Sequence, residues 1–219
     1  ATLKYDAIGA GSWSAGGDLN TSREGGGTGF GTQSAGVAIG GGPGPTTGKL
    51  VEEYNGTAWT EVTNLPTAAI QGGTCGSQIA GLAVGVFSSV KSMSYNGTTW
   101  TELADYNSAR TLGIGAGTST AALYIGAPAS VLTEEYNGTS WTEVGDLNDS
   151  RGQSSGGGVV GGAMMVAGWG GSPSTNPTAT ETYNGTSWTE VAELNSGRAY
   201  LTGGGDTNDA ITFGGGPYP

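Results

Sequence analysis

Histidine is absent from all 219 residues of the chain, and only one cysteine is present. The lack of histidine removes the commonest general base, the Ser–His and Cys–His catalytic pairs and the commonest metal ligand. The single cysteine, Cys75, excludes an intrachain disulfide. Because Cys75 lies between Thr74 and Gly76, we expect a small buried residue on an inner strand rather than a reactive thiol.

Basic residues and long apolar runs are also scarce. Seven Lys and Arg stand against 18 Asp and Glu, giving a net charge of −11. Phosphate binding needs clustered basic residues, so this balance argues against a nucleic-acid partner. We expect no membrane span, because no apolar run approaches about 18 residues, and there is no signal-peptide pattern at the N-terminus. Few lysines and many Thr, Ser and Asn residues are typical of extracellular or virion-surface proteins.

A repeated phrase organises the sequence. Four near-copies of Tyr-Asn-Gly-Thr-x-Trp occur, at Tyr54–Trp59, Tyr95–Trp100, Tyr136–Trp141 and Tyr183–Trp188. A looser fifth copy, Tyr5–Trp13, lies near the start of the chain. The tryptophans that end successive copies are 46, 41, 41 and 47 residues apart. The 31 residues after Trp188 and the 13 through Trp13 together make 44, which matches the other intervals. This arithmetic predicts a closed ring of five equal units.

Each unit has the pattern of four short strands. Asn-Gly between two strand-like runs predicts a two-residue type I′ hairpin, with Tyr136 and Trp141 as diagonal neighbours on one face. No helical periodicity is present, so the fold class is all-β. We therefore predict a five-bladed β-propeller with four antiparallel strands per blade. It forms one domain, with blades at about 16–63, 64–103, 104–145, 146–192, and 193–219 plus 1–15.

The chain ends are expected to complete one blade together. The C-terminal part, from about 198 to 215, supplies its first two strands, and residues at about 2–5 and 12–15 supply its last two. Glycine contributes 45 residues, concentrated in the presumed innermost strands. Only small residues let five backbones converge on an axis, so we expect tight inner strands and no roomy axial channel.

An arginine lies ten residues after four of the five repeat tryptophans. These are the only arginines in the chain, Arg23, Arg110, Arg151 and Arg198, whereas the second unit has Ala69 instead. With the aromatic pair and glycine-rich runs such as 40–42 and 214–216, the pattern resembles kelch repeats over nearly the whole chain. The Tyr–Trp spacing is shorter than the usual kelch turn. The phrase Asn-Gly-Thr-Ser-Trp-Thr-Glu is also similar to repeats in bacteriophage structural proteins.

The arginines and most acidic residues recur with the repeat, which indicates scaffold positions. We expect each guanidinium to pin the loop entering its blade through carbonyls and a nearby carboxylate; the alternative is a ring that binds an anion. Acidic residues five after the tryptophans are the expected partners: Asp18, Asp105, Asp146 and Glu193. The five structural tryptophans of the repeat are Trp13, Trp59, Trp100, Trp141 and Trp188.

Little in the sequence supports catalysis. The copper chemistry of one kelch-fold oxidase needs histidine ligands, which are absent. A glycosidase needs two carboxylates, and the acidic residues outside the repeat pattern are Asp6, Glu24, Asp149, Asp206 and Asp209. The Asp206–Asp209 segment is expected to form a hairpin turn for local reasons, with calcium binding as a minor alternative. We assign no catalytic, cofactor or metal residues.

Positions that differ between units are better candidates for binding. Long connections follow the second strand of the first and fourth units, at 42–48 and 170–177. Trp169 and Phe87 occupy one equivalent position beside such connections. Trp169 is the strongest single candidate for a contact residue, and the alternative is a structural role as a cap over blade packing. The other candidates are Pro43, Pro45, Ser172 and Pro173.

The sequence thus predicts a non-enzymatic structural or assembly protein, on an extracellular or virion surface, that presents variable loops to a partner. The partner is another protein subunit, of the same chain or a virion component. The alternatives are a lectin-like module that binds carbohydrate or a host surface, and, ranked third, a glycoside hydrolase.

Overall fold

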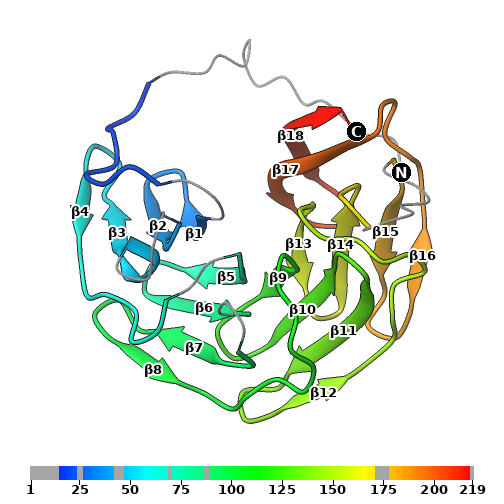
Figure 1. The fold of residues 1–219 in the computed structure, drawn as a ribbon, viewed down its shortest axis with the longest axis horizontal. Coiled ribbons are helices and arrows are strands. Elements are labelled where there is room, and N and C mark those ends of the chain that lie inside the picture. Colours follow the sequence, from blue (N-terminus) through cyan, green and yellow to red (C-terminus); the bar gives the residue numbers. More distant parts are fainter. Residues whose placement is uncertain are drawn as a thin grey trace.

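The computed structural model describes residues 15–23, 27–41, 47–68, 71–85, 89–170 and 178–217. These residues form four antiparallel sheets of four strands and one sheet of two strands, set around a common axis (Figure 1). Strand order in each sheet follows chain order, with the first strand nearest the axis and the fourth at the rim. The sheets are the blades of a β-propeller. The predicted all-β class and the four-stranded blades are confirmed.

The strands of the first two blades are β1 (Thr28–Thr32), β2 (Ala35–Ile39), β3 (Val51–Tyr54), β4 (Trp59–Glu61), β5 (Gly73–Ser77), β6 (Ala80–Val84), β7 (Ser92–Tyr95) and β8 (Trp100–Glu102). Those of the next two are β9 (Ile114–Gly117), β10 (Ala122–Ala127), β11 (Ser130–Tyr136), β12 (Trp141–Glu143), β13 (Ser155–Val159), β14 (Gly162–Val166), β15 (Thr180–Tyr183) and β16 (Trp188–Glu190). The two-stranded sheet contains β17 (Arg198–Gly205) and β18 (Ala210–Pro217), and a short 3₁₀ turn, η1 (Thr47–Lys49), precedes β3. Among the described residues, no helix has the length and apolar character needed to cross a membrane.

The Asn-Gly hairpins share one local structure, which differs from the expected one. Tyr54 lies directly opposite Trp59, so four residues rather than two connect β3 and β4. Of these four, Gly56 alone has a positive φ, of 90°. The Asn55 Oδ1 accepts hydrogen bonds from the backbone N–H groups two and three residues ahead, both at 3.0 Å. The predicted type I′ turn is therefore wrong, because the asparagine side chain, not a left-handed asparagine backbone, reverses the chain.

The aromatic pair of the second, third and fourth hairpins joins its blade to the preceding one. Tyrosine and tryptophan are direct rather than diagonal partners, with ring centroids 4.7 to 5.1 Å apart in the four pairs. Three tryptophans also donate an indole N–H to the preceding blade: Trp100 to Thr63 O (3.1 Å), Trp141 to Ser92 Oγ (3.2 Å) and Trp188 to Thr133 Oγ1 (3.0 Å). This explains why the tryptophan recurs once per unit.

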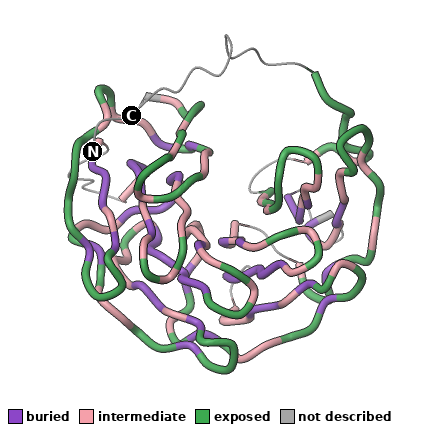
Figure 2. The backbone as a smooth tube through the Cα atoms, turned by 180° about the vertical axis from the view of Figure 1, so that it is seen from behind, coloured by how far each residue is buried: buried purple, intermediate pink, exposed green. Residues whose placement is uncertain are grey.

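The hydrophobic core lies between adjacent blades. One cluster joins Val37 and Ile39 of β2 to Met93 and Tyr95 of β7, and equivalent clusters join the second to the third blade and the third to the fourth. Figure 2 shows the buried residues concentrated in the middle strands, whereas the turns and the rim are largely exposed. A blade therefore buries its faces only against its neighbours, as expected for a ring of repeats.

Glycine lets the inner strands approach each other. A Cβ atom at Gly115 in β9 would lie 2.7 Å from the backbone nitrogen of Thr74 in β5, and one at Gly73 would lie 2.6 Å from Gly115 N. Such distances are too short for real Cβ atoms. The expected close approach of inner strands is thus found between these two blades.

The two-stranded sheet lies where a fifth blade was predicted. Its strands β17 and β18 span 198–217, close to the predicted first two strands of the fifth blade. Most of the N-terminal strands expected at about 2–5 and 12–15 lie outside the described residues. The structure thus shows four complete blades and two strands of a further sheet.

Candidate functional site

Three repeat arginines are buried and each holds the third strand of its own blade. The Nη1 of Arg23 donates to the carbonyl oxygens of Gly40 (2.6 Å) and Leu50 (2.9 Å), and its Nη2 donates to Glu52 Oε1 (2.9 Å). The Arg23 and Glu52 side chains are only 7% and 0% exposed. A charge-assisted contact of this kind fixes the entry loop to the blade.

The third and fourth blades repeat this network. Arg110 pairs with Glu134 at 2.5 Å, and Arg151 pairs with Glu181 at 2.7 Å. In all three blades an asparagine seven residues after the tryptophan donates its backbone N–H and its Nδ2 to one carboxylate oxygen, at 2.7 to 2.9 Å: Asn20, Asn107 and Asn148. Burial by itself raises the pKa of Glu52, but the hydrogen bonds from Asn20, Arg23 and Thr21 lower it below its ordinary value of 4.5.

The carboxylates expected to pair with these arginines are not their partners. Asp105 instead contacts Lys91 at 3.2 Å, and Asp146 accepts a bond from Thr133 N. The prediction was wrong because the facing acid is on the third strand, seven residues before the tryptophan. Since the Nη groups donate to carbonyls and a carboxylate of their own blade, the three arginines have the pinning role rather than the anion-binding one.

The second blade lacks the whole network, not only the arginine. Pro66 and Met93 replace the asparagine and the glutamate, and Ala69, which lies outside the described residues, replaces the arginine. Met93 is 1% exposed and belongs to the core between the first two blades. An apolar group therefore takes the place of the buried charges, and no carboxylate is left without its arginine.

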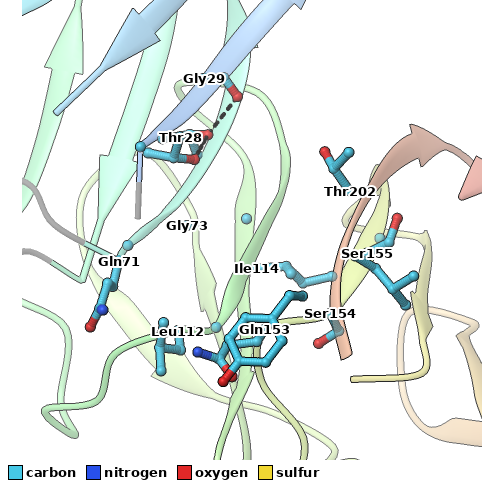
Figure 3. Close-up of a pocket in the computed structure, with 18 of the residues that line it drawn as sticks. Thr28, Gly29, Gln71, Gly73, Leu112, Ile114, Gln153, Ser154, Ser155 and Thr202 are labelled. Carbon is cyan, nitrogen blue, oxygen red and sulfur yellow. Dashed lines mark hydrogen bonds between the residues drawn. The ribbon is translucent and has the colours of Figure 1, made fainter. Parts of the chain in front are cut away.

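A cavity of about 740 Å³ lies on the axis, where the first strands of the blades begin. Glycines supply eight of its 22 described lining residues. Figure 3 shows Gln71 at one side of the cavity, Leu112 and Gln153 along its lower edge, and Ser154, Ser155 and Thr202 on the side away from Gln71. The expectation of no roomy channel was wrong, because glycines that let neighbouring strands approach also leave no side chains to fill the axis.

Four equivalent residues border this cavity, each twelve after a tryptophan, and we call them the crossing residues: Gln71, Leu112, Gln153 and Tyr200. They have positive φ angles of 67°, 67°, 52° and 62°. Their backbones form a chain of hydrogen bonds from blade to blade, at 2.6 Å (Leu112 N to Gln71 O), 2.9 Å (Gln153 N to Leu112 O) and 2.9 Å (Tyr200 N to Gln153 O). The left-handed conformation is therefore maintained by contacts between blades. We call this end of the ring the crossing end.

Three polar atoms of the described lining residues have no hydrogen-bond partner although they are shielded from solvent. These are Nε of Arg23, Oε1 of Gln153 and Oγ of Ser154. Ser154 is only 9% exposed. An unpaired buried oxygen costs roughly 1–3 kcal/mol, so such atoms need an explanation.

The described lining is close to neutral. Arg23 is its only charged residue, and the guanidinium of Arg23 is engaged with Gly40, Leu50 and Glu52. No aspartate or glutamate is among the described lining residues. Within the described ranges, no cluster of three or more His, Cys, Asp or Glu residues is arranged to hold a metal ion. The cavity therefore offers amide, hydroxyl and backbone groups.

Trp169, the strongest sequence candidate for binding, lies at the crossing end but does not line the cavity. Its side chain is half-buried, and its backbone pairs with Gly152 through bonds of 2.7 and 2.8 Å. The backbone N–H of Tyr200 donates to the carbonyl oxygen of Gln153, the residue after Gly152. Trp169 and Tyr200 are therefore bonded to consecutive residues of the chain. The other candidates lie outside the described residues: Phe87, Pro43, Pro45, Ser172 and Pro173.

Two further sequence expectations concern the Asp206 turn and Cys75. Oδ1 of Asp206 accepts bonds from Asn208 N (2.7 Å) and Asp209 N (3.2 Å), which lower the pKa of this exposed carboxyl. The turn thus has the local role expected of aspartate. Cys75 is buried in the inner strand β5, and burial raises the pKa of its thiol to about 12, so the expected unreactive role is supported.

Comparisons with known proteins support the fold. No protein-family model matches the sequence, and no curated protein matches it. Among solved structures, that of YjhT is similar, with a TM-score of 0.75 and 12% sequence identity over 94% of this chain and 76% of that chain. At this identity the likeness concerns the propeller fold alone.

The sequence contained signals for the residues that were missed. Aligning the units on tryptophan places Glu52, Glu134 and Glu181 at one position and Met93 at the same position of the unit that lacks arginine. The glutamate is absent from the same unit that lacks the arginine, which indicates that the two residues form an ion pair. The same alignment places a glycine, Gly25, with the crossing residues, which hints at positive φ.

Proposed function

We propose that the chain is a non-enzymatic recognition and assembly module, a closed five-bladed ring that presents its crossing end to another protein subunit. One observation carries the proposal. Side chains that recur in the blades are engaged with the scaffold, as the Arg–Glu pairs and the tryptophans illustrate, whereas the crossing residues differ from blade to blade. Tyr200 is 66% exposed there, beside half-buried Trp169. Aromatic residues of this kind are enriched at protein interfaces.

Ring closure by the N-terminal residues is part of the proposal. Ser92 and Thr133 each receive the indole N–H of the next blade's tryptophan. Thr180 occupies the equivalent position on β15 of the fourth blade and is 7% exposed. We assign Trp13 as its donor, which would place the N-terminal strands beside β18. The scarcity of lysine and abundance of Thr, Ser and Asn support an extracellular or virion surface as the location.

The assembled mass and shape of the native protein test the assembly role. Light scattering with negative-stain microscopy should show reproducible oligomers or stacked discs. The variant Trp169→Ala should reduce them while circular dichroism stays unchanged. Ile79→Ala is the matched control, because Ile79 is an apolar residue 74% exposed on the β5–β6 turn, away from the crossing end. A monodisperse monomer, or equal loss in both variants, would contradict the proposal.

Carbohydrate binding is the second candidate function, and the axial cavity favours it. The cavity combines amide and hydroxyl groups with an exposed tyrosine at the crossing end. Glycoside hydrolysis is not proposed, since a pair of carboxylates is required and the described lining supplies none.

A further inference from the structure

We infer that the axial cavity binds a neutral, polyhydroxylated ligand, a monosaccharide or short oligosaccharide, through Gln153 and Ser154. This inference deepens the carbohydrate-binding candidate and rests on it, but it does not require the chain to assemble. A volume of about 740 Å³ is within the range of ligand pockets, roughly 300–1,000 Å³.

Ser154 is the first residue that points to a ligand. The equivalent positions of the first three units hold Gly26, Gly72 and Gly113, so the scaffold does not need a hydroxyl there. Nevertheless Ser154 is 91% buried, and its Oγ has no partner within the protein. Serine has three staggered χ1 positions, which allow the hydroxyl to turn toward a ligand in the cavity. A ligand hydroxyl would satisfy a group that is otherwise left unpaired.

Gln153 supports the same conclusion from the neighbouring position. Its left-handed backbone, with φ of 52°, suits glycine best, and Gly25 holds the equivalent place in the first unit. The bonds to Leu112 and Tyr200 use only the Gln153 backbone, so the scaffold makes no use of the amide side chain in them. Its Oε1 is without a partner and is shielded from solvent, so the amide has to turn to reach a ligand; Figure 3 shows the side chain at the cavity.

The remaining wall has the chemistry that sugars recognise. Hydroxyl and amide groups both donate and accept hydrogen bonds, as sugar hydroxyls do. Ser155 and Thr202 add hydroxyls on the side of Ser154, and Gln71 adds an amide across the cavity (Figure 3). Tyr200, which also lines the cavity, is 66% exposed and offers a ring face at the opening. Polar groups converging on one concave surface provide orientation as well as affinity.

Charge selects a neutral ligand. The only cationic group of the described lining, Arg23, is already neutralised by Glu52, and its one unpaired donor, Nε, is shielded from solvent. The protein also has a net charge of −11. An anionic sugar would therefore enter without a counter-charge. A cationic ligand would find no carboxylate in the described lining. An apolar ligand would leave the wall's polar groups desolvated and unpaired.

Binding of defined sugars to the full chain tests the inference. The neutral probes are glucose, galactose, N-acetylglucosamine and their β-linked disaccharides, and the charged probes are glucuronic acid and glucosamine. Saturation-transfer NMR identifies binders and calorimetry measures affinity. The variants Gln153→Gly and Ser154→Gly place the residue of another unit at each position, so folding is expected to survive. Each should weaken neutral-sugar binding about tenfold or more, equivalent to one lost hydrogen bond of good geometry.

The matched control is Gln33→Ala, because Gln33 is exposed in the β1–β2 turn and outside the cavity lining. It should bind as the unaltered protein does. The inference is overturned if no neutral probe binds, if the two glycine variants bind as tightly as the unaltered protein, or if glucuronic acid or glucosamine binds at least as tightly as the neutral probes. If the unaltered protein binds sugar but forms no oligomers, only the assembly role is contradicted, so the two failures are distinguishable.

Discussion

Removing one partner of the buried Arg110–Glu134 pair is expected to destabilise the protein more than removing both. In Glu134→Met the guanidinium, whose side chain is 4% exposed, loses its carboxylate at 2.5 Å. In Arg110→Ala the carboxylate, 0% exposed, loses its cation. Leaving one buried charge uncompensated costs about 3–5 kcal/mol. Either single variant would then remove a large part of the roughly 5–15 kcal/mol that stabilises a typical protein.

The double variant Arg110→Ala/Glu134→Met reproduces the residues that the second blade already contains, Ala69 and Met93. No buried charge is left at this position of the third blade. The backbone N–H groups of Asn107 and Ser108 lose their acceptor. Neither residue is fully buried, so water reaches these groups at least in part. We expect a loss of about 1–3 kcal/mol, hence a coupling free energy of about 3 kcal/mol or more between the two positions.

Urea unfolding followed by tryptophan fluorescence measures all four free energies, provided that the m-values agree. The coupling follows from the double-mutant cycle. If the double variant loses as much as the two single variants combined, the pair is not a compensated unit, and the explanation of the second blade would be wrong.

Four further predictions concern other parts of the molecule. Hydrogen bonds lower the pKa of Glu52 below 4.5, so its contribution to stability is present above that pH and is lost as pH falls through the lower folded-state pKa. Glu52→Gln should therefore flatten the fall of Tm with decreasing pH below about pH 5. The control Glu61→Gln, at an exposed position, should leave this part of the profile unchanged. Parallel profiles for Glu52→Gln and the unaltered protein would contradict the prediction. Deletion of 1–14 should lower Tm and increase hydrogen exchange in β18, with recovery on adding a peptide of these residues; an unchanged Tm would argue against closure. Leu112→Gly should change the free energy of unfolding by less than about 1 kcal/mol in urea, since its φ is 67°, and a larger loss would show that the side chain, not the backbone bond, holds the crossing. Met93→Glu alone should cost several kcal/mol in the same assay because it buries a carboxylate without an arginine, and a near-neutral result would contradict this.

The strand pattern could be predicted because its signals are local. Asn-Gly marks each hairpin, the tryptophan marks the fourth strand, and the same chemistry recurs in every unit. The turn type was missed because Asn55 was assigned a backbone role, whereas its side chain makes the turn. The number of residues between Tyr54 and Trp59 already argued for a four-residue connection, since paired aromatic residues favour direct opposition.

The site was harder to predict because it is formed by contacts between units. The partner of Arg110 is 24 residues away in sequence, and nearer acids competed as candidates. The axial cavity has no sequence motif, because strand starts from all the described sheets converge to make it. The abundance of glycine led us to expect no roomy channel on the axis. Glycine sets how closely neighbouring strands approach, but it does not determine how much space remains at the centre of the ring.

The crossing residues combine a fixed backbone with free side chains. Their N–H and C=O groups link one blade to the next, from Gln71 through Leu112 and Gln153 to Tyr200. Because these bonds involve no side chain, amide, aliphatic and phenolic groups are all accommodated at a left-handed position that favours glycine. Retaining non-glycine residues there costs about 1–2 kcal/mol each, which the bonds between blades help to offset. A position whose backbone is essential and whose side chain is interchangeable is suited to acquiring specificity without loss of the fold. This is why we place recognition at the crossing end, rather than at the Tyr–Trp hairpins, where ring contacts and hydrogen bonds already engage the side chains.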